Sequence, residues 1–226
     1  GVMAEHALAG PVIGVAYDGT GYGTDGTAWG GEILLAHLDR FERIATLLPI
    51  RLAGGDAAIR EPWRIAVALL LDAFKGEVPH DLLGRFGVAD SQVDAVIRIV
   101  QSGLHAPFAS GAGRYFDGIG ALVLGRAHAA FEGQIALAWN GIADTSERGG
   151  YAFIINHETS PWTIDLRLLV ESVVDDMRGG VSPSIISARF HNTLVEATAI
   201  VIESAAAAYG ELPVAMSGGC FQNPRL

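Results

Sequence analysis

The sequence predicts an α/β protein with mixed sheets flanked by helices, and three observations support this fold class. First, the apolar run at residues 11–17 leads into a glycine-rich loop, and residues 28–38 then read as the hairpin partner of that strand. Second, several long stretches of the remaining chain have helical periodicity. Third, residues 213–223, PVAMSGGCFQN, read as a strand that runs into a second glycine turn.

The helices are expected where apolar residues recur at helical spacing between start and stop signals. Residues 90–101 open with an Asp-Ser cap, and the longest helix begins at the N-cap Ser182 and ends at Gly210. Residues 150–168 are rich in turn residues and read as strands. The expected helices cover residues 61–75, 90–101, 113–127, about 168–178 and 182–209, and residues 1–9 read as the tail of another helix.

The composition excludes several function classes. The chain has 15 Lys and Arg residues against 25 Asp and Glu residues, a formal net charge of -10, so no basic stripe is available for a nucleic-acid backbone. Cys220 is the single cysteine, and there is no CxxC, HxxxH or HExxH motif, which fits a reducing cytoplasm. The longest apolar helical stretch, Ile65 to Phe74, is too short to span a bilayer, so no membrane anchor is expected.

The loop in residues 12–26, VIGVAYDGTGYGTDG, holds more glycines than a hairpin corner requires. The surplus indicates backbone amides that are left accessible to a ligand. Because the loop leads into a strand and not into a helix, a P-loop and a dinucleotide-binding turn are excluded. Asp18 and Thr20 end the strand, where they could face a metal or a phosphate, or Asp18 could cap its own turn.

The two glycine turns together indicate a particular nucleotide-binding fold. The adjacent residues Gly218 and Gly219 would let an adenine or ribose approach the backbone closely, although a plain strand-to-helix turn would use them equally well. A strand with Asp-Gly-Thr near one end and a strand with Gly-Gly near the other outline the actin, sugar-kinase and Hsp70 ATPase fold. We therefore expect two related lobes, residues 1–110 with a phosphate hairpin and residues 111–226 with an adenosine turn.

Polar residues between the two turns offer further candidates. Arg114 and Asp117 are neighbours at the start of a helix, and Glu132 follows a turn later. These residues form either a surface salt bridge or a ribose contact, because carboxylates accept hydrogen bonds from both ribose hydroxyls. His191 is expected to be a hydrogen-bonded packing residue, and Cys220 a small buried thiol that does not act as a nucleophile.

Seven segments of the chain are more specific than any single glycine loop: MAEH, DGTGYGTDGTAWGGE, LAGGDAAIREPWRIA, GRYFDGIGALVLG, FEGQIAL, ARFHNTLVEA and SGGCFQN. Together they resemble the HypF carbamoyltransferases, a family that matures nickel-iron hydrogenases. The similarity extends over essentially the whole chain and concerns the HypF domain that is related to the tRNA threonylcarbamoyl transferases, which has the ATPase fold outlined above. We expect the chain to be a fragment of this domain, truncated at both ends.

The resemblance implies a reaction. In this family, carbamoyl phosphate and ATP yield carbamoyl adenylate in a neighbouring domain, and the domain seen here passes the carbamoyl group to the C-terminal cysteine of the partner HypE. The implied cofactors are ATP with Mg²⁺ and a transition metal, zinc or iron. Two histidines of an HxxxH motif, the Asp of the DGTG loop and a later Asp hold that metal, and Asp18 is the only one of these ligands that this chain contains.

The resemblance also distributes roles over the candidate residues. Asp18 is the implied catalytic residue and metal ligand. The hairpin residues are expected to cradle phosphate, and those of the middle segment and the second turn to contact ribose or adenine. The residues expected to bind phosphate are Thr20, Gly21, Gly23 and Gly26. The residues expected to bind ribose or adenine are Asp117, Glu132, Gly218, Gly219 and Asn223.

Two other functions remain open at this stage. The antibiotic O-carbamoyltransferases share the domain, so the acceptor could be a small-molecule hydroxyl. A nucleotide-binding module that only docks a partner, and has no activity as a fragment, is the alternative from a different class. The segments FEGQIAL and ARFHNTLVEA favour the hydrogenase-maturation enzyme over the small-molecule enzyme.

Overall fold

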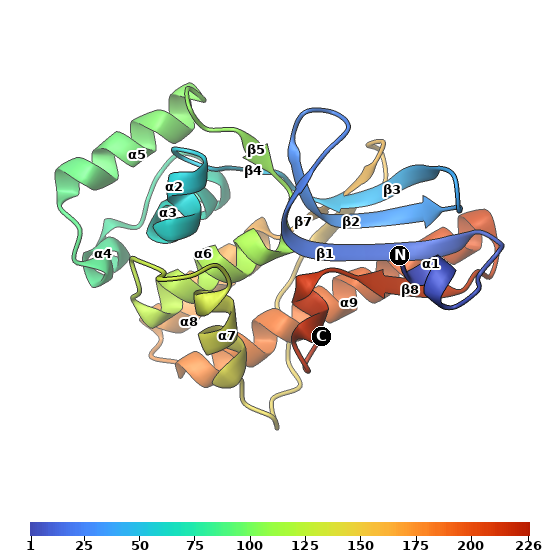
Figure 1. Cartoon of the computed structure of the whole chain (residues 1–226). Coiled ribbons are helices and arrows are strands. Elements are labelled where there is room, and N and C mark those ends of the chain that lie inside the picture. Colours follow the sequence, from blue (N-terminus) through green and yellow to red (C-terminus); the bar gives the residue numbers. More distant parts are fainter.

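The computed structural model describes all 226 residues of the chain. They fold into one eight-stranded mixed sheet with helices packed around it (Figure 1). This architecture confirms the predicted α/β class. The strand order β4-β5-β2-β3-β7-β6 forms the main path, and β1 pairs with both β2 and β8. The strands are β1 Val12–Tyr22, β2 Ala28–Ala36, β3 Phe41–Leu47, β4 Ile50–Arg51, β5 Phe108–Ala109, β6 Ile154–Asn156, β7 Trp162–Asp165 and β8 Val214–Ser217.

The glycine loop joins β1 and β2 as an antiparallel hairpin, which confirms that no P-loop is present. Pairing runs without interruption from Val12 to Tyr17 and resumes only at Gly21. Residues 18–20 therefore stand opposite one residue, Gly30, in a bulge that leaves their backbone groups outside the ladder. The bulge is what turns Asp18 out of the sheet.

Strands from distant parts of the chain complete the sheet. The strand β7 pairs in parallel with β3, and β8 pairs in parallel with β1, where Val15 lies opposite Met216. Both predicted lobes, 1–110 and 111–226, thus contribute strands to the same sheet. The division into two lobes stays a prediction.

The helix α6 (Ala112–Leu124) is the central helix of the core, and residues 112–123 are all buried. Its glycines explain how it packs so closely. A Cβ at Gly118 would lie 2.6 Å from Cδ1 of Leu69 on α3, and one at Gly120 would lie 2.8 Å from Cγ2 of Ile135 on α7. A glycine inside a helix costs about 1 kcal/mol relative to alanine, and here the close approach of two neighbouring helices offsets that cost.

The predicted helices of the chain are confirmed, with small changes at their ends. The Ser182 cap is also confirmed, because its hydroxyl accepts a hydrogen bond from the amide of Ile185. The Asp-Ser cap is wrong: Ala89 is the N-cap, and its amide donates to Gln92, so Asp90 belongs to the first turn. The helices are α1 Val2–Glu5, α2 Asp56–Arg60, α3 Trp63–Ala73, α4 His80–Leu83, α5 Asp90–Ser102, α6 Ala112–Leu124, α7 Gln134–Gly141, α8 Arg167–Arg178 and α9 Pro183–Tyr209, with 3₁₀ turns η1 Gly84–Phe86 and η2 Gly219–Gln222.

The longest helix, α9, has 27 residues and runs obliquely from the lower part of the molecule toward its right side in Figure 1. Neither α9 nor any other helix combines the length and the apolar character that crossing a bilayer requires.

Candidate functional site

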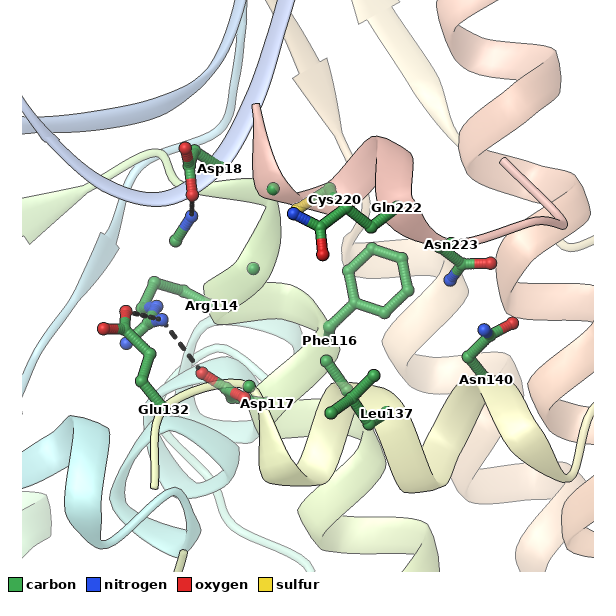
Figure 2. Close-up of a pocket in the computed structure, with 15 residues that line it drawn as sticks. Asp18, Arg114, Phe116, Asp117, Glu132, Leu137, Asn140, Cys220, Gln222 and Asn223 are labelled. Carbon is green, nitrogen blue, oxygen red and sulfur yellow. Dashed lines mark hydrogen bonds and ion pairs between the residues drawn. The ribbon is translucent and has the colours of Figure 1, made fainter. Parts of the chain in front are cut away.

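A pocket of about 260 Å³ lies where four parts of the chain meet: the bulge of β1, the first turns of α6, residues 132–140 and the 3₁₀ turn η2 (Figure 2). Five of the ten predicted site residues line it, and they come from all four parts. These residues are Asp18, Asp117, Glu132, Gly219 and Asn223. The structure thus brings together residues that are up to 205 positions apart, since Asp18 and Asn223 share the pocket.

Glycine backbones allow β1 to touch the start of α6. A Cβ at Gly113 would lie 2.8 Å from the Cα of Gly19, and a Cβ at Gly30 would lie 2.7 Å from the carbonyl oxygen of Asp18. Both distances are shorter than a non-bonded carbon atom accepts. A side chain at Gly113 would push β1 away from α6, and one at Gly30, on β2, would push the bulge of β1 away from β2. The close approach places Asp18 beside the pocket.

Asp18 is exposed at the upper rim of the pocket (Figure 2). Its Oδ1 accepts a hydrogen bond of 2.8 Å from the amide of Gly19, so the carboxylate does cap its own turn. A Cβ at Gly219 would lie 3.3 Å from the same oxygen, which shows that the second glycine turn packs directly against this carboxylate. The capping role and a position at the pocket are therefore compatible.

Arg114 forms an ion pair with two carboxylates in one wall of the pocket. Its Nη2 lies 3.2 Å from Oδ2 of Asp117 and 3.2 Å from Oε1 of Glu132. The side chains of Arg114 and Asp117 are only 2% and 6% exposed, whereas that of Glu132 is 64% exposed. The surface-salt-bridge interpretation is wrong for Arg114 and Asp117, because helix periodicity does not show that β1 covers the first turn of α6.

Burial dominates the electrostatics of Asp117. It raises the pKa of this carboxyl to about 6, while Arg114 acts in the opposite direction and the negative charge of Glu132 adds to the rise. The ionisation of Asp117 therefore depends on the balance between burial and its two charged partners.

The predicted phosphate residues lie outside the pocket. Thr20 and Gly21 belong to the exposed end of β1. Gly23 lies under Trp29, where a Cβ would clash with the indole ring, and Gly26 has a φ of +81° that favours glycine. The hairpin's own packing therefore accounts for two of its four glycines, and phosphate binding by these residues stays a prediction.

Asp25, the second acid of the loop, has a structural role in the hairpin. Its Oδ1 accepts hydrogen bonds from the amide and hydroxyl of Thr27 and from Nε1 of Trp29. Its Oδ2 lies 2.8 Å from Nη1 of Arg43, whose guanidinium stacks on Trp29. These contacts, of which the Thr27 hydroxyl contributes most, lower the pKa of Asp25 to about 2. The hairpin tip is therefore held against β3.

The second glycine turn is held in place by His191. Asn223 donates from Nδ2 to Nε2 of His191 over 2.9 Å, and its Oδ1 accepts from the amide of Arg225. Nδ1 of His191 lies 2.6 Å from the carbonyl oxygen of Ser187, which assigns the ring proton to Nδ1. The packing role predicted for His191 is confirmed. Gly218 packs on the backbone of Tyr17 and does not line the pocket.

Cys220 lines the pocket as a neutral thiol. Burial, followed by the charge of Asp18, raises its pKa to about 12, so the thiolate that a nucleophile requires is suppressed at neutral pH. Cys220 is half-buried and not fully buried as predicted, and its exclusion as a nucleophile stays a prediction.

Ten of the fifteen residues that line the pocket were not predicted as site residues. Among them, Gly113, Arg114 and Gln222 lie inside the segments GRYFDGIGALVLG and SGGCFQN, whose similarity to the family is a signal that could have included them. Asn140 lies in the last turn of α7, and no sequence pattern distinguishes it.

The residues of this chain do not form a metal site. No group of three or more His, Cys, Asp or Glu side chains gathers where it could hold an ion. Asp18 is the single ligand that the resemblance placed here, and one carboxylate does not define a transition-metal site.

The sequence is similar to carbamoyltransferases over nearly its whole length. Residues 14–226 match the family described as carbamoyltransferase, Kae1-like domain, second subdomain. The chain is 36% identical to the carbamoyltransferase HypF of Rhizobium leguminosarum bv. viciae, covering 98% of this chain and 28% of that protein. Identity to HypF of Synechocystis sp. is also 36%, over 98% of this chain and 30% of that protein. A HypF homolog of Cupriavidus necator is 36% identical and is covered to 57% of its length.

Two solved structures share the fold. A full-length HypF in a phosphate- and nucleotide-bound form aligns with a TM-score of 0.90 at 36% identity, covering 98% of this chain and 29% of that one. The HypF of T. kodakarensis aligns with a TM-score of 0.82 at 29% identity, over 99% of this chain and 30% of that one. The chain thus spans less than a third of each of these two solved proteins.

Proposed function

Because the chain belongs to the HypF carbamoyltransferase family, we propose that it supplies the nucleotide-binding part of a domain that transfers a carbamoyl group during nickel-iron hydrogenase maturation. The donor is carbamoyl adenylate, made from carbamoyl phosphate and ATP, and the acceptor is the C-terminal cysteine of HypE. The thiolate attacks the carbamoyl carbon, the new C–S bond forms, the C–O bond to the phosphate breaks and AMP leaves. The proposed location is the cytoplasm.

The observation that supports a nucleotide most directly is the acidic pair in the pocket. Asp117 and Glu132 lie on the same nitrogen of Arg114, so their carboxylates are close neighbours. Two adjacent carboxylates accept hydrogen bonds from the two adjacent hydroxyls of a ribose. A carboxylate pair of this kind binds a neutral polyol better than it binds a phosphate, which it repels.

The opposite wall suits the base of the nucleotide. Gly219, the first residue of η2, presents backbone without a side chain, and Gln222 and Asn223 offer amide groups. A flat purine can approach glycine backbone closely because no Cβ intervenes. The apolar side chains of Phe116 and Leu137 lie between the two walls in Figure 2.

The donor is already activated, so the chain's contribution is to orient it and exclude water from it. We assign Asp18 to the reacting end, because it is an exposed carboxylate at the rim of the pocket (Figure 2). The proposed cofactors are Mg²⁺ with ATP and a zinc or iron ion. The chain by itself offers no complete site for a transition metal, so the roles assigned to its residues involve none.

Calorimetric titration of the folded chain with ATP and Mg²⁺ tests the nucleotide site. Binding of ATP at one site per chain supports the proposal. If ATP produced neither a heat of binding nor a shift of the thermal unfolding midpoint, the proposal would be wrong for this chain. Adding HypE and carbamoyl phosphate to a full-length HypF that carries this sequence then tests the acceptor. Mass spectrometry should find a carbamoyl group on the C-terminal cysteine of HypE, and its appearance on a small-molecule hydroxyl instead would favour the O-carbamoyltransferase alternative.

A further inference from the structure

Arg114 occupies an unusual environment for a cation. It lies in the first turn of α6 with a side chain that is 2% exposed, and it is the only basic residue that lines the pocket. Its Nη2 bridges Asp117 of the same helix and Glu132 of the segment before α7, each over 3.2 Å. A buried guanidinium loses its hydration and is retained only where carboxylates compensate for the loss. The bridge therefore joins two elements through one nitrogen.

The strand β1 closes this ion pair on one side. A Cβ at Gly19 would lie 2.6 Å from Nη2 of Arg114 and 3.0 Å from Oε1 of Glu132. The backbone of Gly19 thus covers the contact and keeps other groups from that nitrogen. The other two guanidinium nitrogens, Nε and Nη1, are buried without a hydrogen-bond partner in the protein, so the orientation of the group depends on its two carboxylates.

The two carboxylates experience different surroundings. Glu132 is largely in solvent, whereas Asp117 is 6% exposed, and burial raises the pKa of Asp117 to about 6. The ionisable groups around Asp117 are Arg114 on α6, Glu132 before α7, Asp18 on β1 and Cys220 on η2. Arg114 is the single group among them that favours the ionised form.

We propose that Arg114 is the positioning residue of the acidic pair: it holds the carboxylates of Asp117 and Glu132 side by side and keeps Asp117 ionised as an acceptor for a ribose hydroxyl. The inference rests on the proposed nucleotide site and assigns a residue that sets its pH range. Arg114 acts through the carboxylates and not on the reacting atoms. A protonated Asp117 would present a donor in place of an acceptor, and the ribose contact would be lost.

The ionisation of Asp117 is tested without any nucleotide. Carbon-13 NMR follows its carboxyl during a pH titration of the wild type, Arg114→Met and Arg114→Lys. Removing an opposite charge at this distance should raise the midpoint of Asp117 by about 1 to 3 pH units, and the lysine variant should raise it less. The matched control is Arg178→Met, which removes an exposed ion pair with Asp81 and should leave Asp117 unchanged.

A second variant protects the test against misfolding. Glu132 is exposed, so Glu132→Gln should fold normally, and it removes a negative charge that raises the pKa of Asp117. The midpoint should move down in this variant, opposite to Arg114→Met. An unchanged midpoint in Glu132→Gln and in folded Arg114→Met would overturn the inference.

Calorimetry with ADP between pH 5.5 and 8.5 connects this ionisation to binding. Wild-type affinity should fall below pH 6. Affinity of Arg114→Met at pH 7 should follow the ionised fraction of Asp117, a loss of about twofold if the midpoint rises by about one pH unit and about tenfold if it rises by about two, and it should recover toward pH 8.5. If Arg114→Met bound ADP weakly at every pH while Asp117 kept its wild-type titration midpoint, the positioning role of Arg114 would be overturned. The proposal of a nucleotide site would not be affected. Absence of ADP binding to the wild type would instead contradict the proposed function, while the NMR midpoints would still decide the role of Arg114.

Discussion

Asn223 donates a hydrogen bond of 2.9 Å to Nε2 of His191, and this contact ties the second glycine turn to the buried face of α9. The other ring nitrogen of His191 lies 2.6 Å from the carbonyl oxygen of Ser187 in the preceding turn of the helix. The contact of Nδ1 with the helix backbone orients the imidazole, and Nε2 then accepts the hydrogen bond from Asn223. The position of a pocket residue thus depends on a histidine that does not line the pocket.

We predict that His191→Leu destabilises the fold and loosens the turn. The substitution leaves the Asn223 amide without its acceptor, and an unpaired buried polar group costs about 1 to 3 kcal/mol. Urea unfolding should show this loss, and amide hydrogen exchange should rise in residues 218–223. His128→Leu, at an exposed position, is the control and should change neither. Equal stability of the two variants would contradict the prediction.

The same histidine predicts a pH dependence of stability. Burial lowers the pKa of His191 to about 4 from an ordinary value of 6.5, so folding favours the neutral ring. Its contribution is complete above pH 6.5 and is lost progressively as the pH falls toward 4, because only the unfolded chain binds the proton in that window. The loss is at most about 3 kcal/mol. The free energy of unfolding should fall less steeply between pH 6.5 and 4 in His191→Leu, and parallel curves would refute the assignment.

Asp18→Asn should separate transfer from activation in a full-length HypF that carries this sequence. The amide retains the size of the carboxylate but removes its charge from the rim of the pocket. Carbamoyl transfer to HypE should be abolished, while carbamoyl-phosphate-dependent cleavage of ATP should continue. Mass spectrometry of HypE and pyrophosphate release measure the two activities. If both survived, Asp18 would serve only to cap the turn at Gly19.

The close approach of β1 to α6 predicts that Gly113→Ala is damaging. The new Cβ would lie 2.8 Å from the Cα of Gly19, and such overpacking costs about 1 to 3 kcal/mol. The thermal midpoint should fall, and ATP affinity with it, because the strand that positions Asp18 is displaced. Gly141→Ala on α7 is the matched control, since nothing lies within 4 Å of its added Cβ. If the thermal unfolding midpoint of Gly113→Ala equalled that of the wild type, β1 would be able to move and accommodate the added methyl group.

Thr20→Ala tests the predicted phosphate role of the hairpin. Thr20 is exposed, so the change should leave stability within about 0.5 kcal/mol of the wild type. A hydrogen bond to a charged phosphate contributes about 1.5 to 3 kcal/mol, so ATP affinity should fall by roughly tenfold or more if the contact is made. Thr24→Ala, exposed on the same loop, is the control. Equal affinities for ATP would remove Thr20 from the site.

Short-range patterns predicted most of the secondary structure. The hairpin followed from the glycines and acids between two apolar runs, and the long helix followed from Ser182, its periodicity and Gly210. The prediction that Asp90 and Ser91 cap a helix was wrong, because the helix begins one residue earlier. Ala89 is the N-cap, and its amide donates a hydrogen bond to the side chain of Gln92. Local rules of this kind succeed because the interactions they describe connect residues within a few positions of one another.

The site was predicted in part. Asp18, Asp117 and Asn223 were chosen from motif position, and the structure brings all three to one pocket. Arg114 was not chosen, because nothing within its own helix indicates that β1 buries it. Gly23 was assigned to a phosphate, whereas its nearest neighbour in the structure is Trp29.

The sequence by itself determined the α/β class, the hairpin in place of a P-loop, and the segments that identify the family, because these depend on local periodicity, turn chemistry and residue identity. The tertiary structure decided which of the predicted site residues share a pocket and how their surroundings shift the ionisation of their side chains. Contacts between distant segments decide both: glycine backbones let β1 reach α6, Glu132 joins the pair of Arg114 and Asp117, and the resulting burial raises the pKa of the Asp117 carboxyl. No spacing along the chain contains that information, since it arises only when segments far apart in sequence exclude water from one another.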